Sequence, residues 1–371
     1  MLATIDEYAR YEKNEMSEVC KMNYHTELLL LGRSIMERDE IIIRNGIVHI
    51  LDSTIGMPVL SDRLLELGPD LNEFLRGHIF KIASSDDISK CEFDKEESIV
   101  YSILREFNEE NLIIISREIA SHLYTIMNQN IDIPPADLFV VTYQVNSTMY
   151  LAILKMNYKE SYIHYAYTEE GENYNDIIKQ KVTLPTESTK LSEAALINLE
   201  DFSIDLVEKK YEINGEKLNY LSTMFLNCHT RLSQKAKLNI ITKAVEQVNK
   251  KYFDENFDKH MEAKAIIHQE YVEQGAIDVE IIGEKLYGDI KEIKEEFTEK
   301  LEKYNLHEAK VEPQNKQTTK KFEKQFLVTD TGIEINIPME QYTEKKNVEF
   351  ITNVDGTISV LIKNINHIRS K

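Results

Sequence analysis

Basic residues gather in one stretch of this sequence at a spacing that suits contact with phosphate groups. Residues 217–251 hold seven Lys and Arg residues against a single acid, Glu246, a local charge of +6 (7 − 1). Six of these cations form the candidate set: Arg231, Lys235, Lys237, Lys243, Lys250 and Lys251. Such groups bind nucleic-acid phosphates and account for most non-specific affinity for DNA. We therefore take these six residues as candidate DNA contacts, with an ordinary solvated helix face as the alternative.

Carboxylates suggest a second chemistry. Glu208, Lys209 and Lys210 follow the strand-like run "FSIDLV", and Asp205 lies three residues before Glu208. Clustered carboxylates hold Mg²⁺, and a lysine stabilises developing negative charge, as a metal-dependent nuclease requires. No carboxylate on a well-separated preceding strand completes the group. Because Glu208, Lys209 and Lys210 still lie together, a metal-dependent nuclease is kept as the alternative function.

The histidines and cysteines do not form a site that sequence spacing can define. Cys20, Cys91 and Cys228 are too far apart for a CxxC-type zinc site or a disulfide framework. His49 lies in the apolar run "GIVHILD", where a buried sheet histidine is expected, and His229 beside Cys228 lacks partners for a metal. No GxxxxGK[ST], HExxH or GxSxG motif occurs. We assign no catalytic residue, no metal ligand and no cofactor.

Composition limits the cellular setting. The net charge is −20, so only a local basic surface can support DNA binding. The apolar run "TELLLLG" is far shorter than the roughly 20 residues that span a bilayer. Asp6, Glu7 and Glu12 occupy positions where a secretory signal is positively charged. We expect a cytoplasmic protein without a membrane segment.

The secondary structure predicted around these residues follows an α+β pattern. We expect strands at 41–51, 138–145, 149–157, 162–167, 178–184 and 202–208. Helices are expected at 61–82, broken by Gly68-Pro69, and at 112–128. The period becomes helical after about residue 218, with Ser233 as the N-cap of a helix to Phe253 and further helices at 257–274, 278–287 and 289–304. Residues 308–320 are polar and contain Pro313, which is typical of a linker.

The predicted organisation is an N-terminal mixed sheet with packed helices, a central all-helical region and a C-terminal β-hairpin region. Its boundaries are an N-terminal extension at 1–36, an α+β domain at 37–216, a helical domain at 217–307, a linker at 308–322 and a C-terminal β region at 323–371.

The stretch "VEFITNVDGTISVLIKNI", residues 348–365, predicts a hairpin around Asp355-Gly356. A two-residue turn would place Phe350 opposite Leu361 and Ile351 opposite Val360, so that both faces are partly covered. The stretch carries one Lys against two acids, a charge of −1, which is unsuited to gripping DNA. We interpret it as framework.

Five stretches together resemble the YejK/NdpA-like family of nucleoid-associated proteins. They are "IIIRNGIVHILDSTIGMPVLSD" at 41–62, "PPADLFVVTYQVNSTMYLAILKMNYK" at 134–159, "YLSTMFLNCHTRLSQKAKL" at 220–238, "TDTGIEINIPMEQY" at 329–342 and the hairpin stretch. The likeness covers about residues 41–366. It implies a bacterial cytoplasmic protein of the nucleoid that binds double-stranded DNA with little sequence preference and touches a type II topoisomerase. It carries over no catalytic residues.

Two further charged stretches are candidate contact surfaces for partners. The cluster Lys316, Lys320, Lys321 and Lys324 offers additional phosphate contacts, or simply solvates the expected linker. The stretch 252–308 holds seven Lys against sixteen acids, a charge of −9. Its acidic helices from 254 to 302 support a third hypothesis, an adaptor that binds a basic protein surface without contacting DNA. A homodimer is a further expected assembly.

Overall fold

The computed structural model describes residues 36–368 except 54–55, 254–255 and 343–346. The chain divides into two compact units, Met1–Glu40 and Ile41–Lys371. The described part of the first unit contains a short 3-10 helix, η1 (Arg38–Glu40). The predicted extension at 1–36 lies outside the described residues apart from Met36, and so does Cys20.

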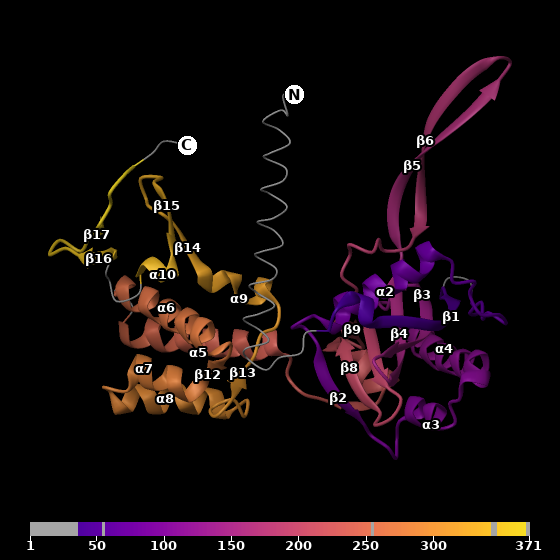
Figure 1. The fold of residues 1–371 in the computed structure, drawn as a ribbon, viewed down its shortest axis with the longest axis horizontal. Helices are drawn as coiled ribbons and strands as arrows, with labels where there is room; N and C mark the ends of the chain where they lie inside the picture. The colour runs from indigo at the N-terminus through magenta and orange to yellow at the C-terminus, as the bar shows by residue number, and fades with distance from the viewer. Residues whose placement is uncertain (1–35, 54–55, 254–255, 343–346, 369–371) are drawn as a thin grey trace, which may run out of the picture. The chain divides into compact units, whose positions relative to one another are not determined.

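The large sheet of the second unit has seven strands among the described residues (Figure 1). In spatial order they are β1 (Ile41–Leu51), β3 (Ala136–Val145), β4 (Thr148–Asn157), β7 (Ala194–Asn198), β8 (Ser203–Val207), β2 (Ser89–Phe93) and β11 (Cys228–Thr230). Each neighbouring pair runs antiparallel. The α+β class is confirmed, whereas the expectation of a mixed sheet was wrong, because short loops and hairpins connect several neighbouring strands.

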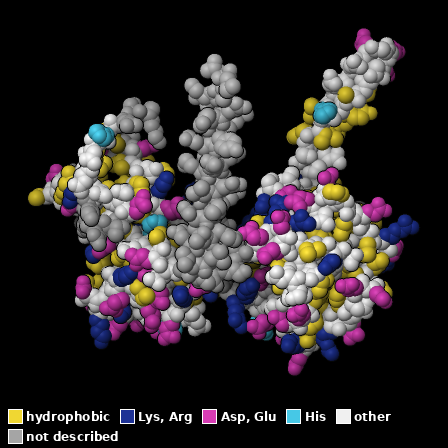
Figure 2. All heavy atoms as spheres, in the orientation of Figure 1, with side chains coloured by type: hydrophobic (Ala, Val, Ile, Leu, Met, Phe, Trp, Pro, Cys, Tyr) yellow, Lys and Arg dark blue, Asp and Glu magenta, His cyan; other side chains and the backbone are white. Residues whose placement is uncertain are grey.

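Two strands that we expected in the sheet form a separate hairpin. β5 (Lys159–Glu169) follows β4, and β6 (Glu172–Thr183) returns to it as a two-stranded ribbon that projects from the sheet (Figures 1 and 2). Glu170 and Gly171 have φ values of +51° and +86°, as a tight two-residue hairpin turn requires. Nearly every residue of the ribbon is exposed. The alternating apolar residues correctly predicted two strands, but the side chains of these strands are not buried.

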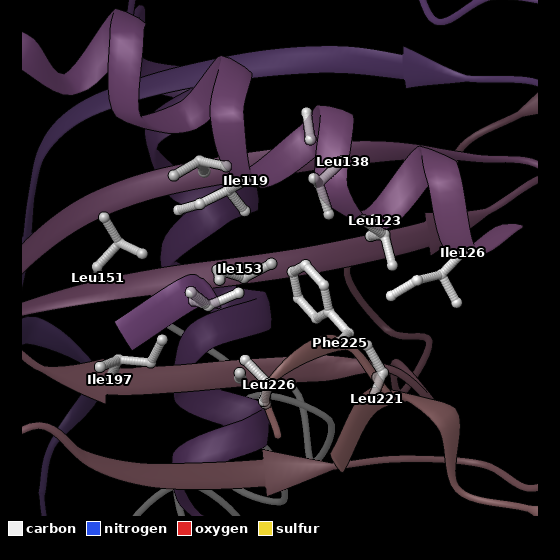
Figure 3. Packing of buried hydrophobic residues seen from close by; sticks show 14 of the residues in the cluster. Ile119, Leu123, Ile126, Leu138, Leu151, Ile153, Ile197, Leu221, Phe225 and Leu226 are labelled. Atoms are coloured by element: carbon white, nitrogen blue, oxygen red, sulfur yellow. The ribbon is translucent and has the colours of Figure 1, made fainter. Parts of the chain in front are cut away.

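The sheet is covered by helices on both faces. α4 (Leu112–Gln129) directs Ile119, Leu123 and Ile126 at side chains of β3 and β4, as Figure 3 shows. α2 (Pro69–Ala83) lies on the opposite face, where Phe74 meets Phe139 at a centroid distance of 6.4 Å. Burial on both faces explains the nearly continuous apolar runs of β3 and β4. The expected helix at 61–82 begins only at Pro69, whose ring suits the first helical position.

Smaller elements complete this first core. They are α3 (Ile99–Arg105), η2 (Glu109–Asn111), β9 (Tyr211–Ile213), β10 (Glu216–Leu218) and the one-turn π-helix η3 (Leu221–Phe225). Leu221, Phe225 and Leu226 pack into the same cluster as α4 (Figure 3). The boundary expected at residue 216 therefore falls before the last strand of the sheet, and the region 217–307 is not entirely helical.

Helices build a second core. They are α5 (Gln234–Phe253), α6 (Phe257–Gln274), α7 (Val279–Tyr287) and α8 (Lys291–Glu302). β12 (Ile277–Asp278), which lies between α6 and α7 in the chain, pairs with β13 (Lys310–Val311), which follows α8. The expected linker at 308–322 contains β13 and most of a helix, α9 (Lys316–Glu323), whose Phe322 is buried in this core. Its polar sequence does not reveal these contacts, because among the described side chains of the two short elements only Val311, Thr319 and Phe322 are buried.

The C-terminal region contains two hairpins around a third core. β14 (Lys324–Val328) pairs with β15 (Glu334–Pro338), and β16 (Val348–Thr352) pairs with β17 (Ile358–Ile362); α10 (Met339–Tyr342) follows β15. The second hairpin is shifted by one residue from our expectation: Phe350 pairs with Val360, and Ile351 pairs with Ser359. The reason is a three-residue loop, 354–356, which ends in Gly356 at φ +83°.

This shift changes which residues are covered. Val348 and Phe350 are buried, with Phe350 against Phe257 of α6 at 4.9 Å, whereas Leu361 is 45% exposed. The expected partial cover on both faces was wrong, because one face packs on α6 and α10 while Leu361 and Ile351 face solvent.

We expect Phe350→Ala to lower the free energy of unfolding by about 3 kcal/mol, because it empties a buried aromatic site. Leu361→Ala, on the exposed face of the same hairpin, serves as the control and is expected to cost less than about 1 kcal/mol. Urea unfolding followed by circular dichroism measures both. Equal losses in the two variants would contradict the one-sided packing.

Candidate nucleic-acid interface

Helix α5 presents the basic residues because its apolar residues bury the opposite face. Ser233 begins the helix as predicted, since its Oγ accepts a hydrogen bond from the Ala236 N–H at 3.1 Å. Leu238, Ile241, Val245 and Val248 are buried in the helical core. The polar positions are therefore left on the outer face.

Three of the six predicted contacts share that outer face. Lys235, Lys243 and Lys250 are exposed and are spaced by eight and seven residues, about two helical turns each. At a rise of ~1.5 Å per residue they form a row roughly 22 Å long. Within the described residues, Lys243 and Lys250 make no ion pair. This row can contact several phosphates of one DNA backbone.

The other three lie elsewhere. Arg231 follows β11 and pairs with Glu92 of β2 at 2.6 Å. Lys251 turns toward α8 and pairs with Glu296 at 2.5 Å, while Lys237 is only partly exposed, on another side of α5. The structure therefore brings Lys235, Lys243 and Lys250 together and separates Arg231, Lys237 and Lys251 from them.

Asp86 anchors the starts of two helices close to each other. Its main-chain oxygen accepts from the Lys235 N–H at 3.0 Å, and its carboxylate accepts from the N–H groups of Gln314 and Asn315 at 2.7 and 2.8 Å. Asn315 is in turn the N-cap of α9. This buried carboxylate thus positions the first turn of α9 beside the first turn of α5.

The second basic cluster consequently extends the row. Lys321 of α9 donates from Nζ to Oδ1 of Asn239, one turn beyond Lys235, at 3.0 Å. Lys264 of α6 donates to Gln325 Oε1 at 2.6 Å from the same side. Burial lowers the pKa of both lysines, with Glu246 opposing the shift in each case. Lys320 and Lys324, which are near Lys321 in the sequence, are exposed.

A cavity of about 300 Å³ lies between α5, α6 and α9. Lys264, Lys321 and His260 line it together with one acid, Glu246. Sequence reasoning missed Lys264 because it belongs to a stretch with strong net negative charge. Only the packing of α6 against α9 places it beside the basic row, so no local sequence pattern could have found it.

An ion pair engages Lys235, the first lysine of the row. Lys235 Nζ lies 3.0 Å from Asp87 Oδ1, and Lys190 pairs with the same carboxylate. Burial raises the pKa of Asp87, but hydrogen bonds from Lys190 and Lys235 outweigh it and lower the pKa. Lys235 is therefore already ion-paired, whereas Lys243 makes no ion pair among the described residues.

The candidate nuclease residues have structural partners. The Glu208 carboxylate accepts from the Ser222 N–H at 3.1 Å and from Ser222 Oγ at 3.0 Å. Burial raises the pKa of Glu208 against these hydrogen bonds, and Asp205 pairs with Lys90 at 2.5 Å. In the described part of the chain, no three or more His, Cys, Asp or Glu residues are grouped so as to hold a metal ion.

Two cysteines that are distant in sequence meet in the sheet. Cys91 of β2 and Cys228 of β11 are both free thiols. A hydrogen bond with Cys228, together with burial, raises the pKa of the Cys91 thiol far above its ordinary value. The Cys91 thiol is therefore a poor nucleophile.

His49 is a buried sheet histidine, as its sequence context predicted. Its Nδ1 accepts from the Ser61 N–H at 3.1 Å, which requires the neutral ring. Burial, and secondarily the charge of Arg117, lowers its pKa from 6.5 to about 4.

This shift predicts a pH dependence of stability. Because the folded pKa lies below the unfolded one, the unfolded chain binds the proton more readily, and the free energy of unfolding falls as the pH drops from 6.5 to about 4. We expect this residue to contribute a loss of at most about 3 kcal/mol. His49→Gln keeps an acceptor that does not titrate, and chemical unfolding across this range should show a shallower loss. An identical loss in the variant would exclude His49 as the source.

The fold, together with the lysines of α5, α6 and α9, defines an acidic α+β protein with a basic surface on its helical region. Residues 47–369 match the family described as nucleoid-associated protein YejK (NA37), so the chain belongs to that family. No curated protein matches the chain. The resemblance inferred from sequence is thereby confirmed, and family membership makes this a bacterial nucleoid-associated protein of the cytoplasm. Across the described residues, no helix combines the length and apolar character needed to cross a membrane.

Proposed function

We propose that the protein binds double-stranded DNA with little sequence specificity through the basic face, which we define as Lys235, Lys243, Lys250, Lys264, Lys320, Lys321 and Lys324. The observation that carries the proposal is the convergence of α5, α6 and α9 lysines from three separate parts of the chain. A single basic surface is sufficient for phosphate contact in a protein of net charge −20.

The residue types favour low specificity. Lysine ammonium groups are point charges that contact phosphates, while base reading uses side chains that reach base edges in a groove. The basic face contains lysine and no arginine, the residue best suited to bidentate contact with guanine. We therefore expect unrelated duplexes to bind with similar affinity.

A salt titration of binding to two unrelated duplexes and one single strand tests this function. If five lysines engage phosphates, the logarithm of the affinity for duplex should fall with the logarithm of salt concentration with a slope of about −4 to −5. The two duplexes should give the same slope, and the single strand a shallower one. Absence of duplex binding at low salt would refute the proposal.

A type II topoisomerase is the proposed protein partner, with the acidic face of α6, α7 and α8 as the contact surface. Lys251, Lys294 and Lys300 pair with acids of these helices, yet many of the acids remain exposed. Co-purification that survives nuclease treatment would support direct contact. Co-purification lost on nuclease treatment would show that DNA bridges the two proteins.

A further inference from the structure

The β5–β6 hairpin, which we call the arm, carries exposed apolar side chains on both faces, and five of them lie together along one face. Directly paired residues share a face, so Ile163 and Ile178, Tyr165 and Asp176, and Tyr167 and Tyr174 lie together. The five apolar members are between 40% and 51% exposed. The tyrosine rings are in contact: Tyr167 and Tyr174 stack across the two strands at a centroid distance of 5.3 Å, and Tyr165 and Tyr167 lie tilted to each other at 5.6 Å.

Among the residues that the structure describes, no other element buries this face, and its five apolar side chains stay at least 40% exposed. A two-stranded hairpin alone is at best marginally stable in water, and exposed apolar edge strands favour association. The arm belongs to a sheet of its own and leaves the seven-stranded sheet between β4 and β7. Figure 2 shows its apolar side chains in the middle of the ribbon and its acidic ones at the tip.

The charge of the arm argues against DNA as its binding partner. Residues 159–183 contain three lysines and five acids, a charge of −2 (3 − 5), and three of those acids, Glu169, Glu170 and Glu172, crowd the tip. Phosphates would be repelled from the end of the arm that reaches furthest. A protein surface is the better fit.

The distribution of charge along the arm is self-complementary. Three of the five acids occupy the tip, whereas Lys159 and Lys181 lie at the base, and Lys179 is already paired with Glu160 at 2.5 Å. Two arms that pack antiparallel about a two-fold axis would place the tip acids of each copy near the base lysines of the other. A parallel arrangement would instead bring six tip carboxylates together.

We infer that the arm is a dimerisation element whose partner is the arm of a second copy of this chain. The Tyr165 face packs on its counterpart, with the two ribbons antiparallel over roughly 34 Å. Half-exposed side chains of this size cover on the order of 100 Å² each, so the five apolar residues bury roughly 1,000 Å² over both copies. That area equals the roughly 1,000 Å² that a biological interface should clear, before the charged ends are counted.

The test measures the mass of nuclease-treated protein by light scattering and sedimentation. The wild-type chain should have twice the 43.2 kDa chain mass. The triple variant Tyr165→Thr, Tyr167→Thr, Tyr174→Thr keeps β-forming residues and should have the mass of one chain. The control Tyr162→Thr, Ile177→Thr changes the opposite face, which is more exposed at 70% and 65%, and should remain dimeric.

A charge exchange tests the orientation. Glu169→Lys, Glu170→Lys, Glu172→Lys should raise the dimer dissociation constant about tenfold or more, since the reversed tips then face lysines. Adding Lys159→Glu and Lys181→Glu should restore it. Circular dichroism verifies folding of each variant.

A monomeric wild-type protein, or a triple tyrosine variant that stays dimeric, would overturn the inference. Failure of the charge exchange to restore the dimer would overturn the antiparallel arrangement. A tyrosine variant with unchanged mass but lost DNA binding would make the arm a DNA contact instead. Because the arm is separate from the basic face, dimer loss with DNA contact retained leaves the proposed function intact.

Discussion

Replacing Lys235, Lys243 and Lys250 with glutamate is expected to weaken duplex binding at low salt by about 100-fold or more. Three phosphate contacts become three repulsions, and the slope of affinity against salt should lose about three units. The loss should be equal for unrelated sequences, because the proposed contacts of these lysines are to the DNA backbone. Gel shift and fluorescence anisotropy over a salt series measure both quantities.

The control for that variant has the same change in net charge at a different place. Lys95→Glu, Lys291→Glu and Lys303→Glu alter exposed lysines outside the basic face. This control should lose much less affinity, and only through long-range charge, which salt screens. Equal losses in the two variants would mean that affinity depends on net charge and not on the α5 row.

The second large effect is on stability and concerns a buried polar network. Glu193 is fully buried, and its carboxylate accepts hydrogen bonds from the hydroxyls of Tyr211, at 2.7 Å, and Tyr220 and from the Asn157 amide at 2.6 Å. Lys155, 2% exposed, lies 3.3 Å away. Burial lowers the pKa of Lys155, and Glu193 opposes that shift.

Glu193→Gln should therefore lower the free energy of unfolding by about 3–5 kcal/mol, because it leaves the Lys155 ammonium buried without a counter-charge. Glu212→Gln, an exposed acid on β9, is the matched control and should change stability by less than about 0.5 kcal/mol. The double variant Lys155→Met, Glu193→Leu should recover much of the loss, since it removes both charges. Urea unfolding measures all three. A cost below about 1 kcal/mol for Glu193→Gln would show that the network is not important for stability.

Local patterns predicted many elements well. β1 spans the predicted 41–51 and α6 the predicted 257–274, and the Ser233 cap begins α5. These signals are local, since alternation, helical period and capping all act within a few residues. The hairpin at 348–365 was also predicted correctly, but its strand register was not. The same residues around Asp355-Gly356 fit a two-residue loop and a three-residue loop, which differ in backbone geometry.

The family, the α+β class and the position of the basic helix could be predicted from the sequence, because each depends on residue order over short distances. Which lysines lie close together depends on tertiary contacts: α6 and α9 pack against α5 and bring Lys264 and Lys321 to the row, while Arg231 and Lys251 form ion pairs with Glu92 and Glu296. It also decided that β5 and β6 leave the sheet with their apolar residues exposed. Both outcomes depend on contacts between distant segments, which the spacing of residues along the chain does not encode.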